Sequence, residues 1–98
     1  MNAWFEALGR RFKEAARKEG VEIAQPELDA QVADEVLELA RVAAHSKERR
    51  FAPLACFMAG VAAERLRQGG ALSPAAEGAY IRAVYQSLEA ENSAAGEQ

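Results

Sequence analysis

The spacing of apolar residues predicts two amphipathic helices in the first half of the chain. Over residues 2–19 and 26–45, apolar positions recur every three or four residues and charged residues occupy the opposite face. Asn2 is a favourable N-cap, Gly20 is typical of a helix end, and Pro26 suits the first position of the second helix. The two apolar faces consist of Trp4, Phe5, Leu8, Phe12, Ala15 and Ala16, and of Leu28, Val32, Val36, Leu39, Ala40 and Ala43.

The second half of the chain predicts two further helices. Pro53 marks the start of the third helix, which we expect to end near residue 68, before two glycines. From Leu54 to Ala63 this helix is apolar on all sides, a pattern typical of a helix inside a bundle. Ser73 is a suitable N-cap for the fourth helix, with Pro74 at its first position, and periodicity ends after Glu91.

These four segments predict an all-α fold, a compact bundle of about four helices. We expect one helical domain over residues 1–91, followed by a frayed tail over residues 92–98. The third helix (about 53–68) should be central. Its large side chains should then be among the most buried in the protein: Leu54, Phe57, Met58 and Val61.

Composition excludes several classes of function. The 98 residues carry a net charge of −3, which argues against a nucleic-acid partner, because phosphate binding requires a basic surface. The longest apolar run, Phe51 to Ala63, is too short to span a bilayer, so no membrane association is expected. The single cysteine, Cys56, indicates a reducing compartment, and the first residues lack the pattern of a signal peptide. We therefore expect a cytoplasmic protein.

Few residues could carry chemistry. His45 and Cys56 are the only residues of their kind and lie eleven positions apart, so we expect no metal site. Cys56 lies in an apolar helix, where core packing is a simpler role than nucleophilic catalysis. No glycine-rich phosphate loop precedes a helix. The sequence therefore predicts no cofactor, no catalytic residues and no enzyme acting alone.

His45 is the most informative polar residue, and it has two interpretations. It can cap the C-terminal end of the second helix, where a positive charge suits the helix dipole. Alternatively, His45 can join Arg49 and Arg50 to bind a small anion above the N-terminus of the third helix. Capping is the simpler interpretation, since basic loops are common on small domains.

The aromatic face of the first helix also has two interpretations. Trp4, Phe5 and Phe12 can belong to the core or can form an interface with another protein. The sequence does not separate these alternatives. It is compatible with a homo-oligomer or with a different protein partner.

Two stretches resemble a family of small uncharacterised bacterial helical domains, a domain of unknown function. They are Leu37–His45 and Arg50–Gly60, and Trp4 matches a tryptophan that is usual in the family. The resemblance implies shared roles for His45 and for Pro53-Leu54. It also implies a link to molybdenum cofactor biosynthesis, because such domains are sometimes associated with molybdopterin-guanine dinucleotide biosynthesis proteins. The charged stretch 47–50 departs from the glycine-containing linker of the family.

Two hypotheses of function follow. The leading one is a non-catalytic helical interaction or accessory module, in homodimeric form or with another protein, because every strong pattern in the sequence concerns packing. The alternative is a binder of a small anionic metabolite or cofactor at the loop before the third helix, with His45, Arg49 and Arg50 as its ligands.

Overall fold

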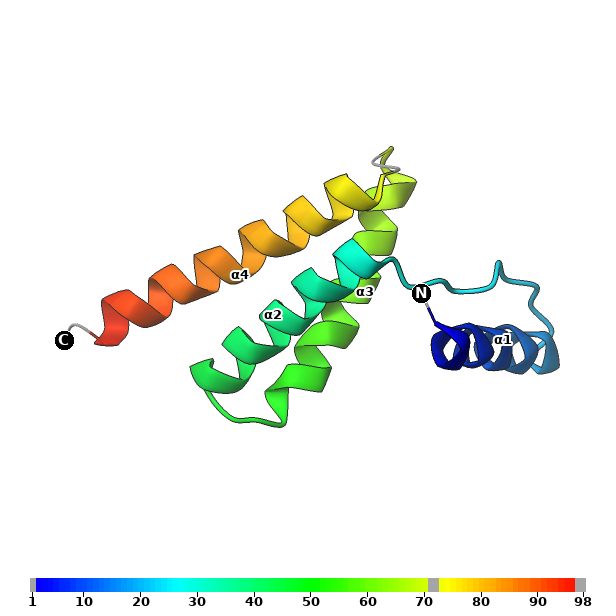
Figure 1. Cartoon of the computed structure of the whole chain (residues 1–98), viewed down its shortest axis with the longest axis horizontal. Coiled ribbons are helices and arrows are strands. Elements are labelled where there is room, and N and C mark those ends of the chain that lie inside the picture. The colour runs from blue at the N-terminus through cyan, green and yellow to red at the C-terminus, as the bar shows by residue number, and fades with distance from the viewer. Residues whose placement is uncertain (1, 71–72, 97–98) are drawn as a thin grey trace. The chain divides into compact units, whose positions relative to one another are not determined.

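A computed structural model describes residues 2–70 and 73–96 of the chain. It confirms the all-α fold: the described residues form four α-helices and no strand (Figure 1). The helices are α1 (Ala3–Lys18), α2 (Ala30–Ser46), α3 (Phe51–Gln68) and α4 (Pro74–Gly96). By its internal contacts the chain divides into two units, Met1–Ala30 and Gln31–Gln98. The single domain over residues 1–91 stays a prediction.

The first unit consists of α1 and an extended segment that returns along it. The Asn2 side chain accepts a hydrogen bond from the Phe5 amide at 3.1 Å, which confirms the predicted N-cap. Gly20 follows the helix with a φ of 83°, a conformation that glycine adopts without strain. The chain then reverses, and the Val21 amide donates to the Ala16 carbonyl at 3.0 Å.

Residues 21–29 are not helical, so α2 begins at Ala30 and the predicted start at Pro26 is wrong. The physical reason is a close contact between this segment and α1. The Gln25 side chain donates to the Glu6 carbonyl at 3.4 Å, and the Pro26 carbonyl lies directly over Gly9. A side chain at position 9 would place its Cβ 2.4 Å from the Pro26 oxygen, so only glycine allows this approach.

Two other helix boundaries differ from those expected. α3 begins at Phe51, two residues before Pro53, which is tolerated in the first turn of a helix. α4 begins at Pro74 as predicted, and the Ser73 hydroxyl accepts from the Ala76 amide at 3.0 Å. It continues through Gly96, five residues beyond the expected end at Glu91, and residues 97–98 lie outside the described residues. The frayed tail over residues 92–98 stays a prediction.

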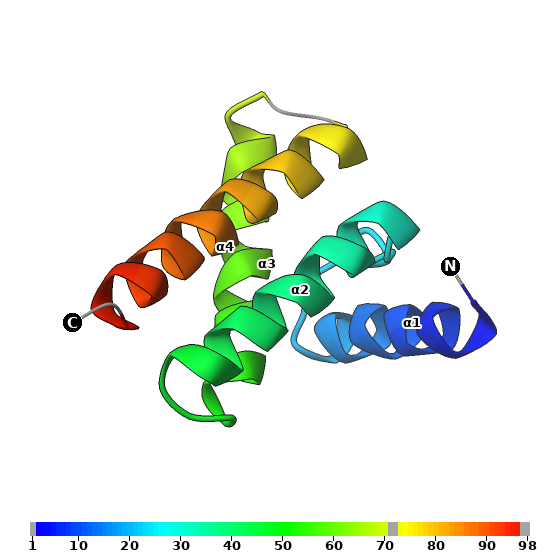
Figure 2. The same cartoon turned by 60° about the vertical axis from the view of Figure 1, so that its left-hand side comes forward.

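In the second unit, α2 and α4 run side by side in the same direction (Figure 2). α3, which follows α2 and precedes α4 in the sequence, runs in the opposite direction. Their core is a cluster of four buried side chains contributed by α2 and α4: Leu39, Val42, Ile81 and Tyr85. Ala59 of α3 packs against this cluster, together with Val32, Val36, Tyr80 and Leu88. The core therefore lies where the three helices meet.

α3 contributes small residues to that core, and its large side chains point outward. Leu54, Phe57 and Met58 are 61%, 75% and 70% exposed, and Val61 is 37% exposed. The expectation that these four residues are among the most buried is wrong. The all-round apolar pattern of α3 does not select a face, and the helix turns its alanines inward, with Ala63 buried.

Candidate functional site

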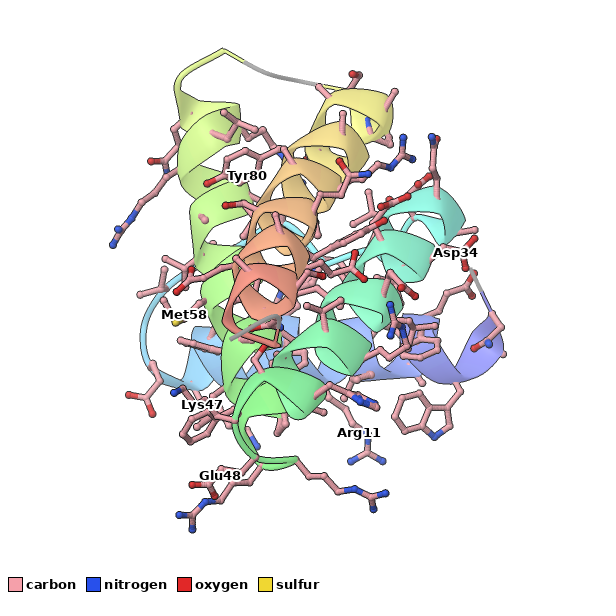
Figure 3. The ribbon with its side chains drawn as sticks, turned by 90° about the vertical axis from the view of Figure 1, so that its left-hand side faces the viewer. Arg11, Asp34, Lys47, Glu48, Met58 and Tyr80 are labelled. Atoms are coloured by element: carbon pink, nitrogen blue, oxygen red, sulfur yellow. The ribbon has the colours of Figure 1, made fainter. Side chains whose placement is uncertain are left out.

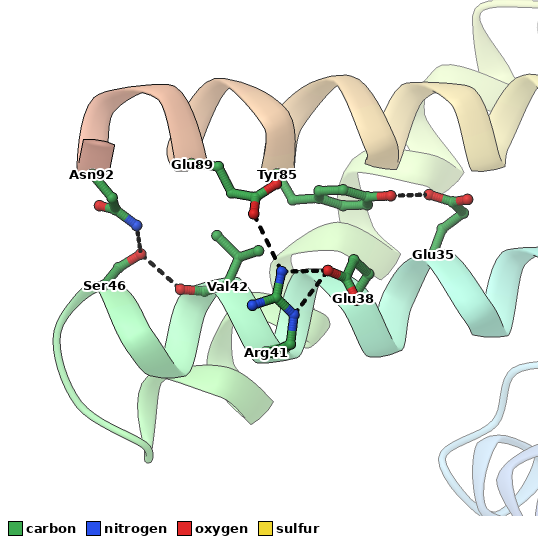
Figure 4. A network of polar contacts seen from close by, with 8 residues as sticks. All are labelled: Glu35, Glu38, Arg41, Val42, Ser46, Tyr85, Glu89 and Asn92. Carbon is green, nitrogen blue, oxygen red and sulfur yellow. Dashed lines mark hydrogen bonds and ion pairs between the residues drawn. The ribbon is translucent and has the colours of Figure 1, made fainter. Parts of the chain in front are cut away.

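Polar side chains join α2 to α4 along one line of the second unit (Figure 4). At one end, the Glu35 carboxylate accepts hydrogen bonds from the Tyr85 hydroxyl and from Nη2 of Arg82, both at 2.7 Å. The Arg82 guanidinium, with the Tyr85 hydroxyl, lowers the pKa of Glu35, although partial burial acts in the opposite direction. Hydrogen bonding to Glu35 in turn raises the pKa of Tyr85. These contacts fix the register of the two helices.

In the middle of the line, Arg41 bridges one carboxylate from each helix. Its Nε lies 2.8 Å from Glu38 of α2, and its Nη2 lies 3.2 Å from Glu89 of α4. The hydrogen bond from Arg41 lowers the pKa of Glu38. Two carboxylates therefore share one guanidinium, and they offset its positive charge.

At the far end, the last turn of α2 is tied to α4 by hydrogen bonds without charge. The Asn92 amide donates to the Ser46 hydroxyl, and that hydroxyl donates to the Val42 carbonyl, each at 2.7 Å (Figure 4). These two bonds tie α4 to α2 just beyond Glu91, where the sequence pattern is no longer periodic.

An open pocket lies beside this end of the two helices. The residues that line it come from α2 and α4: Arg41, Val42, His45, Glu89, Asn92 and Ser93. Guanidinium, imidazole, carboxylate and amide groups converge there, so the pocket offers both donors and acceptors to a small polar molecule. Because Arg41 already contacts Glu38 and Glu89, it would add little to the affinity of the pocket for an anion.

Of the three predicted anion ligands, only His45 lines this pocket. His45 is exposed, lies in the last turn of α2, and lines the pocket. Arg49 and Arg50 lie in the turn that leads to α3 and do not line it. Arg50 contacts Glu48 at 2.5 Å, which offsets its charge. The binding of an anion by His45, Arg49 and Arg50 stays a prediction.

The start of α3 has fewer free amides than the sequence suggests. The Phe51 and Ala52 amides donate to the Glu48 and Arg49 carbonyls at 3.0 and 3.1 Å. Pro53 has no amide hydrogen to offer. An oxyanion at this helix end would therefore depend mainly on side chains rather than on the backbone.

The described residues contain no arrangement typical of metal binding or nucleophilic catalysis. Within residues 2–70 and 73–96, no three His, Cys, Asp or Glu side chains are grouped to hold a metal ion. The Cys56 thiol is partly buried, 3.9 Å from the Val36 carbonyl, and burial raises its pKa, which disfavours the reactive thiolate. None of the described helices combines the length and apolar character needed to cross a bilayer.

The outward face of α3 is the second candidate site, and the sequence reasoning missed it. We define the α3 apolar surface as Leu54, Phe57, Met58 and Val61, all exposed. Met58 projects from α3 on the side away from α2, and Lys47 and Glu48 lie near the start of that helix (Figure 3). Exposed apolar groups that are contiguous along one helix are typical of a protein interface.

A model of the family described as Domain of unknown function (DUF6457) matches residues 1–96. The chain belongs to this family. The match includes both units and therefore extends over the α2–α4 network and the α3 apolar surface. The comparisons with curated proteins and with solved structures found no match.

Proposed function

We propose that this member of the family is a non-catalytic helical interaction module. The observation that supports this most strongly is the α3 apolar surface, on which Phe57 is 75% exposed and Met58 is 70% exposed. A free surface of this kind costs solvation free energy, and a protein partner that covers it removes that cost.

Self-association is one form of this proposal, and sedimentation over a wide concentration range tests it. This form predicts a dimer at micromolar concentration, and Phe57→Ser tests whether α3 takes part in its interface. Val84→Ser is the matched control, because Val84 is a 49% exposed apolar residue of α4. A monomer at every concentration contradicts the homodimer and leaves a different protein as the partner.

The alternative function is binding of a small anionic metabolite by His45, Arg49 and Arg50. The exposure of His45 at the end of α2, and of Arg49 in the turn that follows, favours it. Titration with inorganic phosphate should then shift the backbone amide signals of residues 45–56. The shifts should vanish in an Arg49→Ala/Arg50→Ala double variant, and shifts that persist in that variant contradict the site.

Two finer proposals concern the cellular role. We place the protein in the cytoplasm, on the basis of its single cysteine. We also propose an accessory role in molybdenum cofactor biosynthesis, which rests on the resemblance carried by residues 37–45 and 50–60. Direct binding between the purified chain and a molybdopterin-guanine dinucleotide biosynthesis protein would support that role, and its absence would contradict it.

A further inference from the structure

The α3 apolar surface has a regular spacing and charged ends. Leu54, Met58 and Val61 are four and three residues apart, the spacing of a seam that packs against another helix. Arg50 precedes Leu54 by four residues, and Arg65 follows Val61 by four, so both arginines lie on the same face of α3. At the helical rise per residue, the two arginines are roughly 22 Å apart along the axis.

Both ends of this surface carry positive charge that the second unit does not neutralise. Among its described residues, no ion pair involves Lys47, Arg49 or Arg65. The nearby carboxylates are already engaged, since Glu48 contacts Arg50 and Glu64 contacts Arg67. The positive end of the helix dipole adds to the charge at the start of α3.

These charges argue against the pairing of two α3 helices from two copies of the chain. Residues 47–50 carry three basic side chains and one acidic one, so the start of α3 keeps a net positive charge although Glu48 contacts Arg50. If the two helices ran in the same direction, the two basic starts would meet and Arg65 would meet Arg65. If they ran in opposite directions, the basic start of each helix would meet Arg65 of the other. Like charges oppose each other in both arrangements, so the surface favours an occupant of opposite charge.

We infer that the α3 apolar surface binds an amphipathic helix of another protein, whose apolar stripe ends in acidic residues on both sides. A helix fits because the four apolar residues form a stripe of about two turns, with Arg50 and Arg65 about one further turn beyond its two ends. The acidic ends fit because both ends of α3 are basic, so the complementarity holds for either direction of the bound helix. This inference rests on the proposed interaction function and specifies the chemistry of its partner.

The probe is a synthetic helical peptide of about 20 residues, long enough to cover the stripe. It has blocked termini, leucines at the four-three spacing, and a glutamate one turn beyond each end of the leucine stripe. The control peptide has lysine in place of both glutamates. Binding to the full chain is followed by isothermal calorimetry and by the amide signals of residues 50–65.

We expect the glutamate peptide to bind about tenfold more tightly than the lysine peptide, as two exposed charge contacts would give. Phe57→Ser should abolish binding of both peptides, and Val84→Ser should leave it unchanged. The double variant Arg50→Glu/Arg65→Glu should invert the preference between the peptides. Arg10→Glu/Arg11→Glu makes the same change in net charge on α1 and should preserve the preference.

Three outcomes would overturn the inference. The first is equal binding of the two peptides, or a preference that survives the Arg50/Arg65 reversal. Either result would mean that the apolar surface binds a helix without regard to its charge, and the proposed function would stand. Stronger binding to vesicles containing phosphatidylserine than to either peptide would assign the surface to a lipid. A protein that stays monomeric in sedimentation and binds neither the peptides nor the vesicles would overturn the inference and the proposed interaction function together.

Discussion

Exposure of individual side chains decides how much each one contributes to stability. Ile81 is 3% exposed within the core cluster, and its replacement by alanine should lower the free energy of unfolding by about 2–5 kcal/mol. Phe57 is 75% exposed, so Phe57→Ala should change that free energy by no more than about 0.5 kcal/mol. Urea denaturation of both variants measures the contrast. A large loss in Phe57→Ala would mean that the side chain is buried in solution.

Glu35 makes stability depend on pH at the residue scale. Its pKa is lowered in the folded state by Arg82 and by the Tyr85 hydroxyl, whereas in the unfolded chain it lies near the usual value of about 4.3. The folded state therefore gains stability that is complete above that value and is lost as the pH falls through the lower, folded pKa. Glu35→Gln should remove this part of the acid dependence of the urea midpoint.

A second variant separates the two donors to Glu35. Tyr85→Phe removes the hydroxyl bond and leaves the Arg82 contact, so it should reduce the acid dependence without abolishing it. Glu38, whose pKa is lowered by Arg41, supplies part of what remains. If Glu35→Gln showed the same acid profile as the parent, the carboxylate would not make these bonds in solution.

At the scale of elements, Gly9 determines where α1 meets the segment that follows it. A Cβ at position 9 would lie 2.4 Å from the Pro26 carbonyl, so Gly9→Ala should displace residues 21–29. Overpacking of this kind costs about 1–3 kcal/mol. Nitrogen-15 relaxation should show greater mobility of residues 21–29 in the variant.

Gly60 offers the matched control, because nothing lies within 4 Å of the position of its Cβ in the middle of α3. Gly60→Ala should therefore stabilise the protein by about 0.5–1 kcal/mol through helix propensity alone. If Gly9→Ala stabilised the protein in the same way and left residues 21–29 ordered, the Pro26 carbonyl would not lie against Gly9 in solution.

Local signals predicted the elements well, and long-range contacts explain the differences. Asn2, Gly20 and Ser73 act within one turn of their own helix, so their roles could be predicted from the sequence. Pro26 was misleading because a contact with Gly9, seventeen residues earlier, holds it outside α2. The outward face of α3 could not be predicted either, since a helix that is apolar on all sides has no preferred inner face.

The candidate sites were harder to predict for the same reason. His45 was found because the single histidine of the chain stands at a helix end, and it does line the pocket. The bridge from Arg41 to Glu89 joins residues 48 positions apart, and no local pattern reveals that pairing. The basic ends of the α3 apolar surface were visible in the sequence, but their meaning depends on which face of α3 is exposed.

At the scale of the whole molecule, the core of the second unit is complete within its own residues. Leu39, Val42, Ile81 and Tyr85 all lie in Gln31–Gln98, as do the bonds of Glu35 and Arg41 to α4. A fragment of residues 31–98 should therefore fold alone, with helical circular dichroism and a cooperative thermal transition.

The complementary fragment, residues 1–30, should behave differently. It contains one helix of 16 residues, and isolated helices of about that length are marginal in water. Its circular dichroism should show only partial helix, which mixing with the 31–98 fragment would increase if the two units assist each other. A 31–98 fragment that melts without a cooperative transition would contradict the prediction, because residues 1–30 would then be required to complete its core.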